Sequence, residues 1–410
     1  MPFSAYRTFL HHRAAAGQKR ELVPALPAPE GRIDQRGRRL INFSANNYLG
    51  LADHPLLIAR AREWTALWGC GATASRLVCG NLEPFARIEA RIAAGKGSEA
   101  ALVFNSGFQA NATILTALLD ARILGAEPEV YCDRLNHASL HHGCQAAGVH
   151  QLRYRHNDLN HLETLLKARA HRPGPRFILT ESLFSMDGDL VDLEGLIALK
   201  ERFGAFLYLD EAHATGVFGP NGFGLAAAHP AGVDLALGTF SKGLGGFGAY
   251  AACSELLRDF LVHHAAGLIY STALPPGVLG AMDAALELLP TLDEIRHRLL
   301  TNARIVRERL HALGLNTGSS ASQIIPVLLG DSATALEASR RLEQEEGILA
   351  MAIRPPTVPP HTARLRLSLS AAHQSGELEH LVTALERISA ALPTCDAHAD
   401  GSGSPPGPAP

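Results

Sequence analysis

The sequence predicts an α/β protein in which helices cover both faces of a mainly parallel sheet. Two observations lead to this prediction. Between residues 55 and 270, short apolar segments alternate with amphipathic segments of helical period. Strands that crossover helices bury on both faces show this pattern. After Pro275 and Pro276 the order changes to long helical segments and a few separate strands, which indicates a smaller α+β domain.

These patterns divide the chain into four regions. We expect an N-terminal arm over residues 1–50, a large domain over 51–288, a small C-terminal domain over 289–392 and a disordered tail over 393–410. The arm is basic and partly helical, and it contains a Pro-rich link. The tail reads PTCDAHADGSGSPPGPAP and is too rich in Pro, Gly and Ser to build a packed core.

The large domain contains seven candidate strands, each a short run of mainly apolar residues. They are AALVF (100–104), EVYCD (129–133), HQLRY (150–154), RFILTES (176–182), AFLYLDEA (205–212), VDLALGTF (233–240) and GAYAAC (248–253). Amphipathic helices are predicted between them, for example over 162–170 and 193–203. The small domain adds candidate strands and helices. Its strands are predicted over 323–330, 347–353 and 363–370, and its helices over 276–313, over 332–346 and from about 371 to 391.

Composition excludes several classes of protein. Hydrophobic residues make up 47% of the chain, which is enough for a large core. The formal net charge is −3, so no basic excess favours binding to nucleic acid or to an anionic membrane. The sequence shows no signal-peptide core and no run of 18 apolar residues. Its six cysteines are scattered, which fits a reducing cytoplasm.

One lysine stands at a position where a reactive amine is expected. The chain has only five lysines, and Lys242 is the one that follows a buried candidate strand, 233–240. Ligands of α/β proteins bind at the carboxyl ends of such strands. There a lysine amine can lose its proton and act as a nucleophile or a base. From this residue alone, a turn lysine in water is an equally good interpretation.

Three neighbours of candidate strands favour the reactive interpretation. Asp210 ends the apolar strand FLYL, where its carboxylate could hold the N–H of a pyridinium ring. His213 lies three residues later and could donate to a phenolic oxygen. His137 follows the strand EVYCD, and its imidazole could lie over an aromatic ring.

A phosphate-binding segment completes the set. Gly107 and Phe108 begin a helical stretch directly after the strand AALVF. Backbone N–H groups at a helix N-terminus bind phosphate, and Thr239 and Ser241 are possible hydroxyl partners. Each feature alone is weak. Together with Lys242 they supply the contacts that pyridoxal 5′-phosphate (PLP) requires, so we predict PLP as the cofactor.

At this point the chain resembles the α-oxoamine synthases, a family within the fold-type I PLP-dependent enzymes. The resemblance covers nearly all of residues 40–375, in family order. The matching segments include FSANNYLGL (43–51), FNSGFQANATIL (104–115), DRLNHASLHHG (133–143), TESLFSMDGDLVDL (180–193), LDEAHATGVFG (209–219), GTFSKGLG (238–245), IYSTALPP (269–276) and AIRPPTVPPHTARLRLSLSAAH (352–373). The resemblance implies an aspartate aminotransferase-like fold with a mainly parallel central sheet and a smaller α+β C-terminal domain.

The resemblance also implies roles for individual residues. Lys242, His137 and Asp210 would be the catalytic residues, with Lys242 forming the imine with PLP. The implied cofactor contacts are Gly107, Phe108, His137, Ser185, Asp210, His213, Thr239, Lys242 and Thr272. Thr272 would reach the phosphate held by the other subunit, so a homodimer is implied. The implied substrate contacts are Arg20, Asn46, His137, Thr357 and Arg366. Lys19 fits the arm position almost as well as Arg20. No metal site is expected.

Within the family, the IRPPTVP stretch and the chain length most resemble the members that serve biotin biosynthesis. Those members condense L-alanine with a pimeloyl thioester, releasing CO₂ and a free thiol, and the thioester is carried either on coenzyme A or on acyl carrier protein. Three alternatives stay open: another α-oxoamine synthase that uses glycine or serine, an ordinary aminotransferase, and a non-catalytic partner or regulatory subunit.

Overall fold

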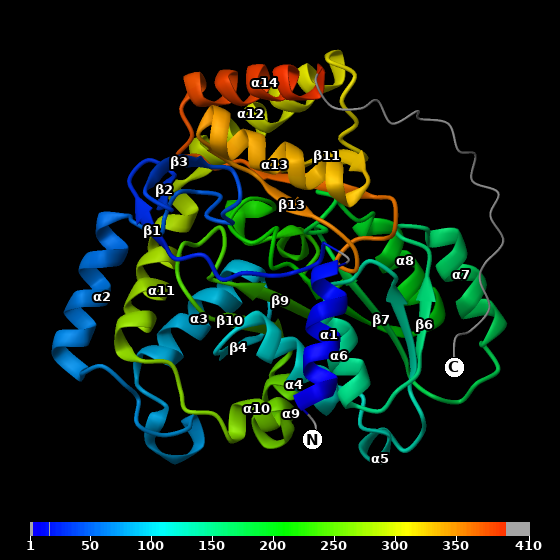
Figure 1. Ribbon diagram of the computed structural model, residues 1–410. Helices are drawn as coiled ribbons and strands as arrows, with labels where there is room; N and C mark the ends of the chain where they lie inside the picture. Colours follow the sequence, from blue (N-terminus) through cyan, green and yellow to red (C-terminus); the bar gives the residue numbers. More distant parts are fainter. Residues whose placement is uncertain (1–2, 16, 391–410) are drawn as a thin grey trace.

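A seven-stranded sheet lies at the centre of the computed structural model, which describes residues 3–15 and 17–390 (Figure 1). The strand order is β4-β10-β9-β8-β7-β5-β6, and only β10 runs antiparallel to its neighbours. The strands are β4 (Ala100–Phe104), β5 (Glu129–Asp133), β6 (Gln151–Tyr154), β7 (Arg176–Glu181), β8 (Ala205–Asp210), β9 (Leu235–Thr239) and β10 (Ala249–Cys253). All seven predicted strands are confirmed, each to within two residues at either end, and so is the α/β class. The predicted tail over 393–410 lies outside the described residues.

Helices cover both faces of this sheet. Leu102, Val130 and Leu237 point to one face and pack on one set of helices. That set is α4 (Gly107–Leu118), α6 (Ala138–Ala146), α9 (Glu255–His264) and α10 (Ala266–Ile269). The next residues along the strands, such as Tyr131 and Ala236, point to the opposite face because side chains alternate along a strand. The helices on that face are α3 (Pro84–Lys96), α7 (Leu159–Ala168) and α8 (Leu193–Phe203).

Two of these helices begin at the carboxyl edge of the sheet, and polar side chains fix their first turns. Ser106 caps α4 by accepting a hydrogen bond from the backbone N–H of Gln109. His137 caps α6 by accepting one from the N–H of Ser139. Side chains that accept from these otherwise unpaired N–H groups define where a helix starts. The caps therefore fix both helix N-termini next to the strand ends that carry the candidate site.

The C-terminal part of the chain forms a second layer above the large sheet (Figure 1). A three-stranded antiparallel sheet, in the order β11-β14-β13, packs with long helices. Its elements are α12 (Asp293–Ala312), β11 (Ile324–Gly330), α13 (Ser332–Glu346), β12 (Ile348–Leu349), β13 (Met351–Ile353), β14 (Ala363–Ser368) and α14 (Ser375–Ala390). Helix α11 (Pro276–Leu288) ends where the proposed boundary between the two domains, 288/289, lies.

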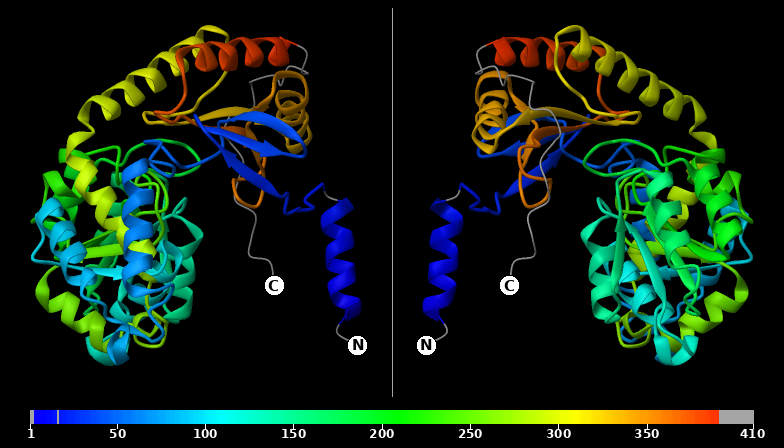
Figure 2. Two further views of the ribbon diagram at one scale, coloured as in Figure 1. Left: turned by 90° about the vertical axis from the view of Figure 1, so that its left-hand side faces the viewer. Right: turned by 90° about the vertical axis from the view of Figure 1, so that its right-hand side faces the viewer.

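The N-terminal arm contains a helix, in agreement with its prediction as partly helical, and also three strands that were not predicted. Helix α1 (Phe3–Ala15) is present, and none of its residues is buried. Figure 2 shows it standing apart from the layers of the sheet. Three strands follow it: β1 (Ala25–Ala28), β2 (Arg32–Gln35) and β3 (Arg38–Asn42). Strand β3 pairs with β12, about 300 residues later, so the arm joins the C-terminal layer.

One further long helix, one short helix and several short turns complete the described chain. They are α2 (Pro55–Trp68), a π-helical turn over Arg76–Gly80, α5 (Ala121–Leu124) and 3₁₀ turns over Pro220–Gly222, Leu225–Ala228 and Leu289–Thr291. Among the described helices, none combines the length and apolar character that crossing a bilayer requires.

Candidate active site

The predicted site residues meet at the carboxyl edge of the large sheet. Asp210 is the last residue of β8, Glu181 is its paired neighbour at the end of β7, and Lys242 follows β9 by three residues. His137 lies four residues after β5. A cavity of about 320 Å³ opens there. Its lining residues are Ser44, Asn46, His137, Ser185, Met186, His213, Lys242, Met351, Ile353 and Arg366.

Lys242 presents its amine inside this cavity. The amine Nζ lies 2.8 Å from Nε2 of His213, whose Nδ1 lies 2.6 Å from the hydroxyl of Tyr48. Burial lowers the pKa of Lys242 to about 8, against the opposing effect of Asp210 and Glu181. At pH 7 a group with such a pKa is unprotonated in about a tenth of molecules, which is several hundred times the fraction for an ordinary lysine. The site therefore supplies a usable amine nucleophile.

Asp210 is held rigidly and is 4% exposed. Its Oδ2 accepts a hydrogen bond of 2.7 Å from the amide of Asn111, and its Oδ1 accepts one of 2.9 Å from the N–H of Ala212. The Asn111 carbonyl oxygen in turn accepts from the hydroxyl of Tyr208. Sequence reasoning missed Asn111. The one available signal is a polar residue inside the apolar helix QANATILTALL.

His137 is tied to the same network from the other side. Its Nδ1 lies 2.7 Å from the hydroxyl of Ser139, which accepts a hydrogen bond from the amide of Asn111. Its backbone N–H donates to Oε1 of Glu181. Burial lowers the pKa of His137, so the imidazole is neutral at pH 7. Burial raises the pKa of Glu181 well above its usual value, with Asp210 adding to the effect.

Arg366 brings a positive charge to the cavity from β14 in the C-terminal layer. Its guanidinium donates to the hydroxyl of Ser368 at 2.7 Å, to Oδ1 of Asn46 at 3.1 Å and to the carbonyl of Ser185. All these partners are neutral, and among the described residues no carboxylate pairs with it. By contrast, Arg364 on the same strand pairs with Asp187. Arg366 is therefore free to bind the carboxylate of a ligand.

The start of α4 closes against the end of β9. A Cβ atom placed on Gly107 would lie 2.8 Å from Cγ2 of Thr239, closer than such atoms approach. Only glycine lets the helix N-terminus and Thr239 come together here. The side chain of Phe108, the next residue, is half exposed. The backbone N–H groups of this helix N-terminus are suited to bind a phosphate, while the Thr239 hydroxyl donates to the carbonyl of Ala212.

Several predicted contacts do not line this cavity. Asp210, Gly107, Phe108 and Thr239 lie at or next to the strand ends beside it, and Arg20 (or its alternative Lys19), Thr272 and Thr357 do not line it either. Arg20 and Lys19 are exposed in the arm. Thr272 is exposed too, and its carbonyl accepts a hydrogen bond from the amide of Asn105. Thr357 lines a neighbouring outer cavity instead of the inner one. The roles of these residues remain predictions.

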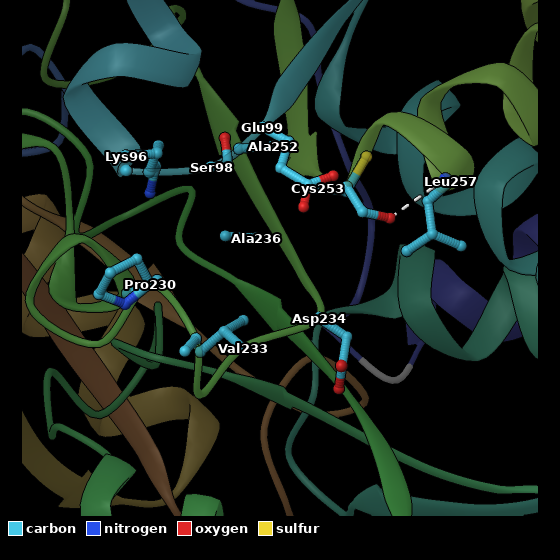
Figure 3. Close-up of a pocket in the computed structure, with 14 residues that line it drawn as sticks. Lys96, Ser98, Glu99, Pro230, Val233, Asp234, Ala236, Ala252, Cys253 and Leu257 are labelled. Atoms are coloured by element: carbon cyan, nitrogen blue, oxygen red, sulfur yellow. Dashed lines mark hydrogen bonds between the residues drawn. The ribbon is translucent and has the colours of Figure 1, made fainter.

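Three of the other four lysines form ion pairs outside this cavity. Lys167 forms an ion pair with Glu163 on the same helix, α7. Lys200, on α8, forms one with Asp234, which precedes β9. Lys96 is 2% exposed and pairs with the buried Glu211. Although burial by itself lowers the pKa of Lys96, Glu211 holds it above its ordinary value. Lys96 lines a second cavity, of about 410 Å³, at the opposite edge of the sheet (Figure 3).

A histidine paired with two carboxylates joins the loops that carry site residues. His156 contacts Asp133 at 3.0 Å and Asp189 at 2.8 Å. Asp133 precedes the loop to His137, and Asp189 ends the loop that contains Ser185. Burial opposes the charged ring, but the two aspartates outweigh it and raise the pKa of His156 to about 10. The imidazolium is thus a fixed cation at pH 7.

The two ion pairs of His156 lead to a prediction about how the stability of the protein depends on pH. A raised folded-state pKa means that the stabilisation is complete below about pH 6.5 and is lost as the pH approaches 10. We expect the free energy of unfolding to fall by about 1–3 kcal/mol from this group, after allowance for its partial exposure. Urea titrations at pH 6.5 and pH 9.5 would measure the fall. His156→Gln should reduce it, and His171→Gln, on the surface, should not. Equal falls in wild type and His156→Gln would contradict a charged His156.

Comparison with known proteins places the chain in a family. The family model of class I and II aminotransferases matches residues 38–385. An 8-amino-7-oxononanoate synthase of Gluconacetobacter diazotrophicus is 57% identical over 356 residues, covering 86% of this chain and 89% of the relative. A Magnetococcus marinus protein that provisionally bears this name is 64% identical over 386 residues, covering 94% and 98%. The chain belongs to the 8-amino-7-oxononanoate synthase family. This confirms the resemblance to α-oxoamine synthases.

A solved structure supports the same fold. A serine palmitoyltransferase variant from S. paucimobilis, with a bound PLP–myriocin aldimine, superposes with a TM-score of 0.87. It is 27% identical, and the match covers 95% of this chain and 98% of that one. The fold-type I prediction is therefore confirmed for this member of the 8-amino-7-oxononanoate synthase family.

Proposed function

We propose that this chain catalyses the PLP-dependent, decarboxylative condensation of L-alanine with a pimeloyl thioester. The products are 8-amino-7-oxononanoate, CO₂ and the free thiol, as in biotin biosynthesis. The observation that carries the proposal is the placing of Lys242 and the unpaired Arg366 in one cavity beside Asp210, in a chain 57% identical to a named 8-amino-7-oxononanoate synthase.

The residues of the cavity fit PLP. Lys242 offers an amine of lowered pKa, and Asp210 offers a buried carboxylate for a ring nitrogen. The helix N-terminus at Gly107, beside Thr239, would hold the phosphate, and a larger residue at 107 would fill this space. His213 lies within hydrogen-bond reach of the Lys242 amine and would hold the ring's phenolic oxygen, while His137 lines the cavity and would stack on the ring. The serine palmitoyltransferase variant, which is 27% identical to this chain, has PLP bound as its myriocin aldimine, and this supports the same cofactor here.

When bound, PLP supplies an electron sink for the carbanion formed at Cα of alanine. The residues of the chain do the rest. Lys242 would hold the cofactor through its amine, and the same amine, when free, would remove the Cα proton of alanine as a general base. Asp210 keeps the ring nitrogen protonated through a charge-assisted hydrogen bond. Asn111 holds that carboxylate in place from behind.

Arg366 orients the amino acid. Its guanidinium, fixed by Asn46 and Ser368, binds the alanine carboxylate in a paired geometry. The Cα carbanion then attacks the thioester carbonyl and expels the thiol. Loss of CO₂ and reprotonation at Cα complete the reaction. The neutral imidazole of His137, on the cavity wall, can polarise the thioester carbonyl.

We infer that the enzyme acts as a homodimer. The exposed Thr272 pairs by a backbone bridge with Ser75, next to the π-helical turn over Arg76–Gly80. This region exposes large apolar side chains, with Val78 at 78% and Tyr270 at 84%. Exposed apolar patches of this kind mark interaction sites. A partner subunit covering them would bring Thr272 to the phosphate of its neighbour's cofactor.

We also infer that the enzyme works in the cytoplasm. Five cysteines lie within the described residues, and all five are free thiols. Free thiols persist in the reducing cytosol, which supports the prediction from the sequence. Fractionation of the native cells would test it.

Thiol release tests the proposed function directly. The holoenzyme is incubated with a pimeloyl thioester and one amino acid at a time: alanine, glycine or serine. We expect alanine to give the highest kcat/KM, and mass spectrometry to identify 8-amino-7-oxononanoate. Faster release with glycine or serine would assign the chain to another α-oxoamine synthase activity. Conversion of the cofactor to its amine form without a thioester would indicate an aminotransferase.

A further inference from the structure

An outer cavity of about 720 Å³ continues the active site toward the surface. It shares His137, Ser185 and Met186 with the inner cavity that holds Lys242. A substrate whose reactive carbonyl reaches Lys242 can therefore extend into the outer cavity. The character of the outer walls then decides which acyl donors fit.

Two arginines on one wall of this outer cavity are free of ion pairs. Arg134 and Arg153 both line it, and neither meets a carboxylate among the described residues. Arg153 pairs with Cys132 across β5 and β6, and Arg134 lies two residues after Cys132. Arg134 is the first residue after β5 and Arg153 lies in the neighbouring strand β6, so the ends of two adjacent strands bring both arginines to the same cavity. The backbone N–H of Arg134 bonds to the Tyr154 carbonyl and keeps the two strand ends together.

Nothing else in the lining neutralises this pair. Asp187 is the one acidic residue of the described lining, and it pairs with Arg364. His141 lies on the same wall, where burial lowers its pKa and Arg153 lowers it further. His141 is therefore uncharged at pH 7. The wall presents two guanidinium groups with a net positive charge, and guanidinium groups bind carboxylate and phosphate in paired geometry.

Much of the remaining lining is apolar. Its apolar members are Leu135, Ala138, Phe184, Met186, Pro355, Pro356, Val358, Pro359 and Pro360, and Met186 also lines the inner cavity. A chain of methylene groups can lie along such a surface, gaining about 0.8 kcal/mol for each group that it buries. The outer cavity thus joins an apolar path to a cationic end.

We propose that Arg134 and Arg153 form an anion-binding subsite that selects the acyl donor by a negative group at its far end. The proposal rests on the proposed function and assigns the residues that recognise the far end of its acyl donor, a thioester of an α,ω-dicarboxylic acid. The methylene chain lies along the proline wall, and the distal carboxylate binds the two guanidinium groups. The phosphate of a pantetheine carrier arm shares this anionic chemistry, so the test separates the two sources.

The test compares three acyl donors in the double variant Arg134→Gln/Arg153→Gln. Pimeloyl-N-acetylcysteamine carries the carboxylate without any phosphate, heptanoyl-N-acetylcysteamine carries neither, and pimeloyl-coenzyme A carries both. We expect kcat/KM for pimeloyl-N-acetylcysteamine to fall about 10- to 100-fold, mainly through KM, because hydrogen bonds to charged groups are lost. The value for heptanoyl-N-acetylcysteamine should stay unchanged. Arg62→Gln, an exposed arginine on α2, is the matched control.

Each outcome decides the proposal. A loss confined to pimeloyl-coenzyme A would keep the subsite and assign it to the carrier's phosphate. Unchanged kcat/KM for all three donors would overturn it. If wild type itself releases no thiol, the proposed function fails, and calorimetry of pimeloyl-N-acetylcysteamine binding to the holoenzyme still tests the subsite. Equal affinity of wild type and the double variant would then reject it.

Discussion

Lys242→Ala is expected to abolish thiol release from a pimeloyl thioester and alanine. The amine both holds the cofactor and removes the Cα proton, and alanine supplies neither function. Proton transfer alone contributes about 10²–10⁴-fold to such rates, and loss of the covalent role adds to this. We expect a fall in kcat of at least about 10⁴-fold. The purified variant should also lack the visible absorbance of lysine-bound PLP.

The control for this experiment is Lys167→Ala, which removes an exposed lysine from an ion pair on α7. Such surface pairs contribute about 0–1 kcal/mol to stability, so turnover and absorbance should match wild type. Circular dichroism would verify that the Lys242→Ala chain is folded. Alanine-dependent turnover retained in a folded Lys242→Ala enzyme would rule out Lys242 as the reactive amine.

The strands and the reactive centre could be predicted from the sequence because both depend on local signals. The run FLYL has no charged residue because both faces of its strand are covered by helices. Its carboxyl end is then known, and with it the place of Asp210. Lys242 follows another such run. Strand ends in a parallel sheet meet at one edge, so two separate segments could be assigned to one site.

The supporting contacts could not be predicted, because they depend on which elements meet in space. Strand β3 has few apolar residues, and its pairing with β12 leaves no local pattern. The sequence places Asn111 in a helix but does not indicate that its amide donates a hydrogen bond to Asp210. The hydroxyl of Tyr48 hydrogen-bonds with Nδ1 of His213, although 165 residues separate the two in the sequence. The pair of Arg134 and Arg153 likewise appears only when β5 and β6 align.

Asp210→Ala is expected to leave a weak enzyme that still binds PLP through Lys242. Without the carboxylate the ring nitrogen loses its proton, and the negative charge formed at Cα of alanine has a poorer sink. Removal of one preorganised electrostatic partner typically reduces kcat by about 10²–10³-fold. Both thiol release and exchange of the alanine Cα proton with deuterated water should fall to this extent, since Asp210 acts on the step that they share.

The two readouts separate this role from a structural one. Asp210 also fixes Asn111, so Asp210→Ala leaves a buried amide with one partner fewer and could loosen the site. A loosened site would lower PLP occupancy, which absorbance measures independently of rate. Asp259→Ala, which removes an exposed carboxylate on α9, should leave both rates unchanged. If Asp210→Ala binds PLP fully and still exchanges the Cα proton at the wild-type rate, Asp210 does not support the electron sink, and another group must protonate the ring.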